Sequence, residues 1–226
     1  MRTKSDVKRQ AILDIAAQVF QEHGFERTSM SEISARVGGS KATLYSYFPS
    51  KEELFFEALH RSTEVEFEAT HRALAESAVA AGTAGTDKFD ATHKALSLSD
   101  DLGAVLREFG ERFIALLYSE KLLAARRLII CESERSQLGR ICYMRGPQRS
   151  QAQVAEFLSS AMQQGKLRQA DPKIAALHLR GLLESELLDR FLFQIDITVS
   201  KAEIKRVVAN AVDAFMAAYG PLPGHS

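Results

Sequence analysis

Residues 27–54 read RTSMSEISARVGGSKATLYSYFPSKEEL, and this stretch decides the fold of the N-terminal part of the chain. Ser29 and Glu32 form the capping-box pattern that opens a short helix, and the Gly38-Gly39 pair ends it. Ser40 then caps a second short helix, which a proline stops. Two short helices joined by a tight glycine turn are typical of a helix-turn-helix.

The rest of the chain also shows helical periodicity, with no sustained strand alternation. A helix from about residue 7 ends at Gly24, and Lys51 opens a connecting helix that we expect to reach about residue 75. Residues 78–90 have the composition of a flexible link. Later helices are expected over 102–117, 119–134, 147–164, 172–193 and 200–219, with Asp171 and Ser200 as the caps of the last two. The sequence therefore predicts an all-α fold with two domains, a three-helix helix-turn-helix domain over 7–59 and a larger helical bundle over 90–220.

The composition is that of an ordinary soluble protein, with 46% hydrophobic and 26% charged residues among 226. No apolar run approaches the roughly 20 residues of a membrane span, and residues 1–10 lack a secretory signal, so we expect a cytoplasmic protein. Cys131 and Cys142 lack metal-site spacing, so we expect reduced thiols and no metal. The chain holds 29 basic and 29 acidic residues, but residues 1–51 hold eight basic and five acidic ones, which favours polyanion binding at this end.

The second helix of the helix-turn-helix has small or hydrogen-bonding side chains at its N-terminal end. Residues 40–43 therefore leave room for this helix to enter a DNA major groove, which is about 12 Å wide. The phenols of Tyr45 and Tyr47 follow on its flanks, where they can reach phosphates. Lys51 comes in the first turn of the next helix, whose free amides also favour an anion. The pattern predicts DNA binding.

Residues 27–54, and within them the runs Thr43-Leu44-Tyr45 and Tyr47 to Leu54, closely resemble the DNA-binding domain of TetR/AcrR-family transcriptional regulators. The resemblance covers the chain from about Val7 to Leu59 and implies a homodimer that binds double-stranded operator DNA. It places four side chains near base edges, namely Ser31, Lys41, Ala42 and Thr43. It places six at phosphate-contacting positions, namely Thr28, Ser29, Ser40, Tyr45, Tyr47 and Lys51.

Two residues depart from the family pattern. Gly39 stands where the family usually has Val, and Ser34 stands where it usually has Ala. Gly39 removes an apolar contact from the turn and adds backbone freedom. We therefore expect the recognition helix to be looser without DNA, by ~0.5–1 kcal/mol.

The C-terminal part resembles, less specifically, regulators with an AcrR-like ligand domain. The resemblance lies in the order of residues 127–132, Gly146-Pro147, 165–172 and 175–183. Many such proteins repress a neighbouring efflux or detoxification operon and are released by an inducer. The resemblance thus implies a ligand-released repressor of a palindromic operator, whose C-terminal domain binds a largely apolar small-molecule effector and pairs the subunits.

Candidate residues for these two roles come from the apolar helices of the C-terminal part. The helices over 172–193 and 200–219 are apolar over more of their surface than one buried face needs, which favours a two-fold interface over plain core. The predicted dimer-interface residues are Leu182, Leu188, Phe191, Val208, Val212 and Phe215. The residues nominated for a ligand cavity are Phe109, Phe113, Leu117, Tyr118, Arg127, Cys131, Tyr143, His178 and Glu184. For each of these nine, plain core or a satisfied polar group is the more common alternative.

Three other functions compete with this interpretation. An enzyme is disfavoured, because the six histidines form no HxxxH or HExxH pair and the sequence has no Gly-rich phosphate loop or nucleophile elbow. We expect neither catalytic residues nor a cofactor. An architectural DNA protein would need far more positive charge than this neutral chain carries. Operator-specific, salt-sensitive binding would exclude a purely structural helical protein.

Overall fold

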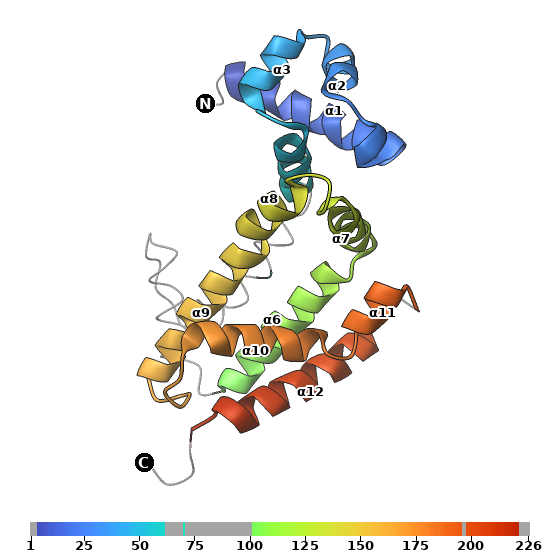
Figure 1. Ribbon diagram of the computed structural model, residues 1–226. Coiled ribbons are helices and arrows are strands. Elements are labelled where there is room, and N and C mark those ends of the chain that lie inside the picture. Colours follow the sequence, from blue (N-terminus) through green and yellow to red (C-terminus); the bar gives the residue numbers. More distant parts are fainter. Residues whose placement is uncertain (1–3, 62–69, 71–100, 196–197, 222–226) are drawn as a thin grey trace. The chain divides into compact units, whose positions relative to one another are not determined.

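The computed structural model describes residues 4–61, 70, 101–195 and 198–221, and all regular structure in them is helical (Figure 1). This confirms the predicted all-α fold. The contacts group the chain into two compact units. Unit 1 comprises Met1–Val65 and Ala124–Gly146, and unit 2 comprises Glu66–Leu123 and Pro147–Ser226. Residues 124–146 fall inside the expected C-terminal domain over 90–220, yet they pack with the N-terminal part of the chain.

Unit 1 is built around the predicted helix-turn-helix. It contains α1 (Lys4–Arg27), α2 (Met30–Val37), α3 (Lys41–Tyr47), a helix over 51–61, most of α7 (Glu120–Glu132) and α8 (Leu138–Arg145). The first helix bends at Gly24, whose φ of +76° lies in the left-handed region, and one further helical turn follows it. Beyond residue 61, the expected connecting helix and the link over 78–90 lie outside the described residues, apart from Thr70.

The core of unit 1 centres on three phenylalanine rings. Phe55 lies edge-on to Phe20 and to Phe25, with ring centroids 5.2 and 5.3 Å apart. Leu54 and Ala58 of the helix over 51–61 are buried with Phe55 in the same core. This helix therefore packs directly against both halves of the bent α1.

Helix α8 belongs to the same core. Leu138 and Cys142 are buried in it, and burial raises the pKa of the Cys142 thiol to about 12, so this thiol stays protonated at neutral pH. Arg145, at the end of α8, pairs with both Glu53 and Glu57 of the helix over 51–61. Apolar packing and an ion-pair cluster therefore join the segment 124–146 to the helix that follows the helix-turn-helix.

Unit 2 is a helical bundle formed by α6 (Leu102–Leu117), α9 (Pro147–Gln163), α10 (Pro172–Glu184), α11 (Leu188–Phe193) and α12 (Lys201–Tyr219) (Figure 1). Helix α12 packs against α6 and α10, and α10 also packs against α9. At Gly110, an added Cβ would lie 2.7 Å from Val208 Cγ1 and 2.9 Å from Leu183 Cδ2. Any larger side chain at this position would therefore force Val208 or Leu183 to move where α6 meets α10 and α12.

The expected helix over 172–193 is divided in two. A turn over 185–187 separates α10 from α11, and in this turn the Ser185 hydroxyl donates to the Leu182 carbonyl at 2.7 Å. The predicted caps at Asp171 and Ser200 are confirmed, because their side chains accept hydrogen bonds from the first turns of α10 and α12. Within the described residues, no helix is both long and apolar enough to cross a membrane.

Candidate nucleic-acid interface and ligand hollow

The two helices of the helix-turn-helix are capped as the sequence predicts. The Ser29 hydroxyl accepts from the Glu32 amide at 3.2 Å, and the Ser40 hydroxyl accepts from the Thr43 amide at 3.1 Å. Gly38 ends α2 with a φ of +71°, in the left-handed region where a glycine is favoured. The turn between the helices is thus fixed by local bonds on both sides.

The two residues that depart from the family pattern bond to each other. The Gly39 amide donates to the Ser34 carbonyl at 3.2 Å, and the buried Ser34 hydroxyl donates to the Gly39 carbonyl at 2.8 Å. The second bond needs a hydroxyl at position 34, which Ala cannot supply. The looser turn that we expect from Gly39 is therefore opposed by a hydrogen bond from Ser34.

Ser34→Ala is expected to lower the free energy of unfolding by about 1 kcal/mol, because it removes a buried hydrogen bond to the turn. Chemical denaturation of the full chain measures this loss. Ser31→Ala is the matched control, since Ser31 is exposed on the same helix, and it should change stability by less than about 0.5 kcal/mol. Equal stability of the two variants would show that the Ser34 bond does not hold the turn.

Most of the predicted DNA-contacting side chains are accessible in unit 1. Ser29, Ser31, Ser40, Lys41, Ala42 and Tyr45 are exposed, and Thr43, Tyr47 and Lys51 are half-buried. Thr28 differs, because its side chain is buried at 2% exposure and its hydroxyl donates to the Gly24 carbonyl at 2.7 Å. That hydroxyl closes the end of α1, so the structure disfavours the phosphate contact expected for the Thr28 side chain.

Lys51 also has an internal role. Its ammonium donates to the carbonyl oxygens of Phe25 at 2.8 Å and Thr28 at 3.1 Å. It also lies 4.2 Å from the centroid of the Phe25 ring. The Lys51 ammonium is therefore bound to the C-terminal end of α1, whereas the family resemblance implies that it contacts a DNA phosphate. Sequence periodicity does not reveal this bond, which joins residues 26 positions apart.

Two residues near the start of α1 were missed by the sequence analysis. Lys8 is exposed and lines a shallow hollow together with Ser40 and Thr43 of the helix-turn-helix. The Ser5 hydroxyl lies 3.5 Å from the Tyr47 hydroxyl. The first turns of α1 therefore lie beside the N-terminal end and flank of α3. The net positive charge of residues 1–51 was the one available signal, and it could not single out Lys8.

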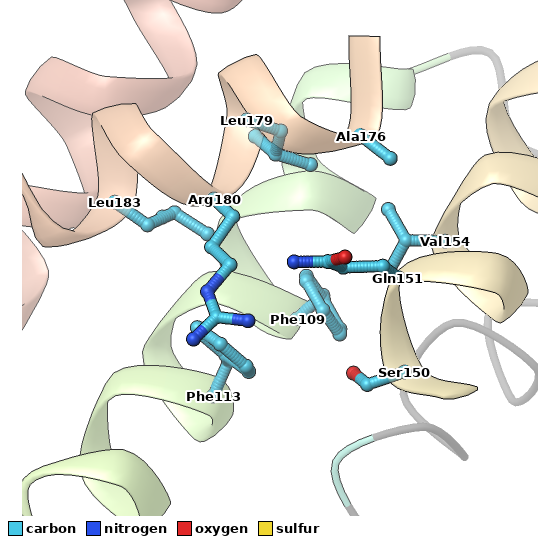
Figure 2. Close-up of a pocket in the computed structure, with 9 residues that line it drawn as sticks. All are labelled: Phe109, Phe113, Ser150, Gln151, Val154, Ala176, Leu179, Arg180 and Leu183. Carbon is cyan, nitrogen blue, oxygen red and sulfur yellow. The ribbon is translucent and has the colours of Figure 1, made fainter. Parts of the chain in front are cut away.

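Unit 2 contains a small hollow, partly open to solvent, between α6, α9 and α10 (Figure 2). Its walls are Phe109, Phe113, Ser150, Gln151, Val154, Ala176, Leu179, Arg180 and Leu183. Of the nine residues nominated for a ligand cavity, Phe109 and Phe113 line it. The other seven lining residues carry no distinctive sequence pattern, so sequence reasoning missed them.

A buried polar cluster adjoins this hollow. Glu184 is only 6% exposed, and its carboxylate accepts from the Tyr118 hydroxyl at 3.3 Å and from Arg180 Nε at 3.2 Å. Two more of the nominated residues, Tyr118 and Glu184, are therefore connected to the hollow through Arg180. Leu117 packs against the core of unit 2.

The remaining nominated ligand residues lie elsewhere. His178 is exposed, and its Nδ1 lies 2.6 Å from the Tyr219 hydroxyl. Arg127, Cys131 and Tyr143 belong to unit 1 and are not among the residues that line the hollow. The sequence placed them near a cavity because the segment 124–146 was expected in the C-terminal domain.

The predicted dimer interface needs a correction. Phe191 is 2% exposed, and Val208, Val212 and Phe215 are all 0% exposed. They form the core between α6, α10, α11 and α12 of one chain, so they have no surface to offer a second chain. Of the six predicted residues, only Leu182 and Leu188 reach the surface. The large exposed apolar side chains of α10 and α11, which we call the outer apolar surface, are Ile174, Leu177, Leu188, Leu192 and Phe193.

Comparisons with known proteins cover both parts of the chain. The family described as "Bacterial regulatory proteins, tetR family" matches residues 12–58. The family described as "AefR-like transcriptional repressor, C-terminal domain" matches residues 104–221, which is more than half of the chain. All regular structure among the described residues of both matched ranges is helical, as the predicted fold requires.

Two solved structures are similar over nearly the whole chain. A TetR-family regulator from Mesorhizobium loti MAFF303099 has a TM-score of 0.76 and 31% identity, and the match covers 97% of this chain and 100% of that one. The flavonoid-responsive regulator FrrA has a TM-score of 0.70 and 30% identity, with coverage of 95% and 97%.

A curated relative is similar over a shorter stretch. The HTH-type transcriptional repressor ComR of Escherichia coli (strain K12) is 40% identical over 65 residues, which are 29% of this chain and 30% of ComR. The chain thus matches less than a third of the length of this curated relative. The family match over more than half of the chain and the likeness over nearly all of it to a solved TetR-family regulator show that this chain belongs to the TetR family of bacterial transcriptional regulators.

Proposed function

We propose that the chain is a ligand-released repressor that binds a palindromic operator as a homodimer in the cytoplasm. The observation that carries DNA binding is the N-terminal end of α3, where Ser40 caps the helix and Lys41 and Ala42 are exposed. A helix end with small, exposed side chains fits the major groove. Membership of the TetR family supports the same role.

The contacts to DNA divide into two groups. We assign base contacts to Ser31, Lys41, Ala42 and Thr43. We assign phosphate contacts to Ser29, Ser40, Tyr45 and Tyr47, and we add Lys8 because it is exposed beside Ser40 and Thr43. Thr28 and Lys51 act indirectly, by holding the end of α1 against the start of the helix over 51–61.

Variants of Lys8 and Thr43 test this division. Lys8→Ala is expected to weaken binding to all duplexes alike and to lower the slope of log affinity against log salt by roughly one unit, because one phosphate loses its cation. Thr43→Ala is expected to change base preference by about 1–3 kcal/mol at one position. Fluorescence anisotropy with selected and scrambled duplexes at several salt concentrations measures both effects.

Lys205→Ala is the control, because Lys205 is an exposed lysine of unit 2, and its salt slope should equal that of the wild type. An unchanged slope for Lys8→Ala would remove Lys8 from the phosphate contacts. An unchanged base preference for Thr43→Ala would remove Thr43 from the base contacts.

The homodimer is proposed to form through the outer apolar surface. Its large side chains stand exposed on α10 and α11, and Ile195 just beyond α11 is also exposed, whereas most large apolar side chains described in unit 2 form its core. We propose that a second copy of the chain covers this surface, because a two-fold dimer presents one recognition helix to each half-site of a palindromic operator.

Release by a ligand is proposed to act through unit 2. The likeness to a regulator described as flavonoid-responsive supports a response to a small molecule, and the hollow offers a place for it. A ligand that favours the DNA-free arrangement by ~1–3 kcal/mol would lower operator affinity roughly 5- to 150-fold, and operator DNA would lower ligand affinity by the same factor. The resemblance of the C-terminal part points to an efflux or detoxification operon as the target.

A further inference from the structure

The hollow of unit 2 has one aromatic wall. Phe109 and Phe113 of α6 line it, and their rings stack with centroids 5.6 Å apart and planes inclined by 21°. Val154, Leu179 and Leu183 supply further apolar contacts. Phe109 is buried at 2% exposure and Phe113 is half-buried, so Phe113 presents the accessible part of this wall. A flat, apolar group can pack on such a ring face to face or edge to face.

Two polar side chains also reach into the hollow. Figure 2 shows the Arg180 guanidinium descending from α10 toward Phe113, and the Gln151 amide extending from α9 toward the centre of the space. Arginine carries five N–H donors, and the bond to Glu184 uses the one on Nε. The terminal nitrogens of Arg180 and the amide of Gln151 can therefore each donate to a ligand in the hollow.

The Arg180 side chain is held in position by an ion pair with Glu184. Glu184 is buried, holds Arg180 through Nε, and is itself held by the Tyr118 hydroxyl. The opposite charges of Arg180 and Glu184 balance, so the hollow offers hydrogen-bond donors without a large excess of positive charge. This arrangement suits an acceptor oxygen on the ligand, and it disfavours a cationic ligand beside the guanidinium.

We propose that the hollow binds an aromatic compound with an acceptor oxygen on the ring, as in a phenol or an aromatic carboxylate, an inference that rests on the proposed ligand response. The ring packs on Phe113, which stacks on Phe109, and the oxygen accepts from Arg180 and Gln151. Arg180 determines the specificity for oxygenated rings. Glu184 is a positioning residue that acts through Arg180.

Three probes that share one ring system test this proposal. Naphthalene, 2-naphthol and 2-naphthoate are titrated into the full-length protein, and binding is followed by calorimetry and by naphthyl fluorescence, which is free of tryptophan background because the chain has no Trp. Both oxygenated probes are expected to bind about tenfold or more tightly than naphthalene, as one hydrogen bond to a charged donor provides. Comparing the affinities of 2-naphthol and 2-naphthoate shows whether the hollow prefers a phenol or a carboxylate.

Two variants assign the preference to the polar side chains. Arg180→Lys keeps the charge beside Glu184 but loses the guanidinium fork, and it should reduce the preference for oxygenated probes to about twofold without changing naphthalene affinity. Gln151→Leu leaves the ion pair intact and should reduce the preference about threefold or more. The control is Arg190→Lys, since Arg190 has the same 29% side-chain exposure as Arg180 and also pairs with a glutamate.

Arg190→Lys should bind all three probes as the wild type does. The proposal is overturned if naphthalene binds as tightly as its oxygenated relatives, if none of the probes binds, or if neither Arg180→Lys nor Gln151→Leu lowers the preference. Operator binding is measured on the same preparations. Intact DNA binding without probe binding overturns this inference alone, whereas probe binding without DNA binding overturns the proposed regulator.

Discussion

Val212→Glu is expected to unfold unit 2, whereas Leu188→Glu is expected to leave it folded and to separate the dimer. Val212 is 0% exposed in the core of one chain, and Leu188 is 39% exposed on the outer apolar surface. An unpaired carboxylate in such a core costs several kcal/mol, which is a large part of the ~5–15 kcal/mol that stabilises a typical domain. The same carboxylate at Leu188 stays hydrated in the monomer and opposes only the contact with a second copy.

Circular dichroism melting curves and sedimentation velocity distinguish the two outcomes. Leu188→Glu should melt close to the wild type, sediment as a monomer at micromolar concentration, and bind operator about 100-fold or more weakly, because one monomer holds one half-site. Gln163→Glu, which adds the same charge at an exposed polar position of α9, should remain dimeric. A Val212→Glu protein with wild-type stability, or a Leu188→Glu protein that still dimerises, would contradict the assignment of these two residues.

Lys51→Met is expected to lower the free energy of unfolding by about 2–3 kcal/mol, because it removes a charged donor from the carbonyl oxygens of Phe25 and Thr28. The aliphatic part of the side chain is kept, so packing changes little. DNA affinity should fall as the end of α1 loosens. The salt dependence of binding should stay unchanged, because no phosphate contact is lost.

Chemical denaturation and salt-dependent DNA titrations measure these effects together. Lys41→Met is the control, since Lys41 is exposed at the start of α3, and it should leave stability within about 0.5 kcal/mol of the wild type while it weakens DNA binding. Wild-type stability of Lys51→Met together with a salt slope lower by roughly one unit would restore the phosphate contact that the family resemblance implies for Lys51.

Local sequence signals predicted the framework of the fold. The caps at Ser29, Ser40 and Asp171 and the left-handed turn at Gly38 depend on bonds within a few residues, and the structure shows each of them. The division of the helix over 172–193 was missed, because Ser185 to Leu187 include neither glycine nor proline. Breaks without such residues depend on packing between helices, which one sequence does not display.

The other differences between the sequence predictions and the structure come from tertiary packing. The sequence pattern does not distinguish Val212 from Leu188, because both belong to helices that are apolar around much of their circumference. Only packing decides that one side chain is buried and the other is exposed. Likewise, the pairing of Arg145 with Glu53 joins residues 92 positions apart, so the sequence could not show that the segment 124–146 packs with unit 1.

Of the residues that line the hollow, the sequence likewise predicted some and missed others. Phe109 and Phe113 were nominated from an apolar helix of the C-terminal part; they lie one helical turn apart on α6, and they do line the hollow. Arg180 and Gln151 are ordinary surface residue types on helices, and nothing in their spacing marks them. Their role depends on how α9 and α10 face α6.

The most direct test of operator recognition by a dimer is a selection of duplexes from a random DNA pool by the full-length protein, followed by sequencing. We predict an enriched inverted repeat whose half-sites lie about 10–10.5 base pairs apart, centre to centre, or a multiple of that spacing. Leu188→Glu, selected in parallel, should enrich no repeat. Enrichment of single half-sites by the wild-type protein, or no enrichment above the starting pool, would contradict the proposed binding of a palindromic operator by a homodimer.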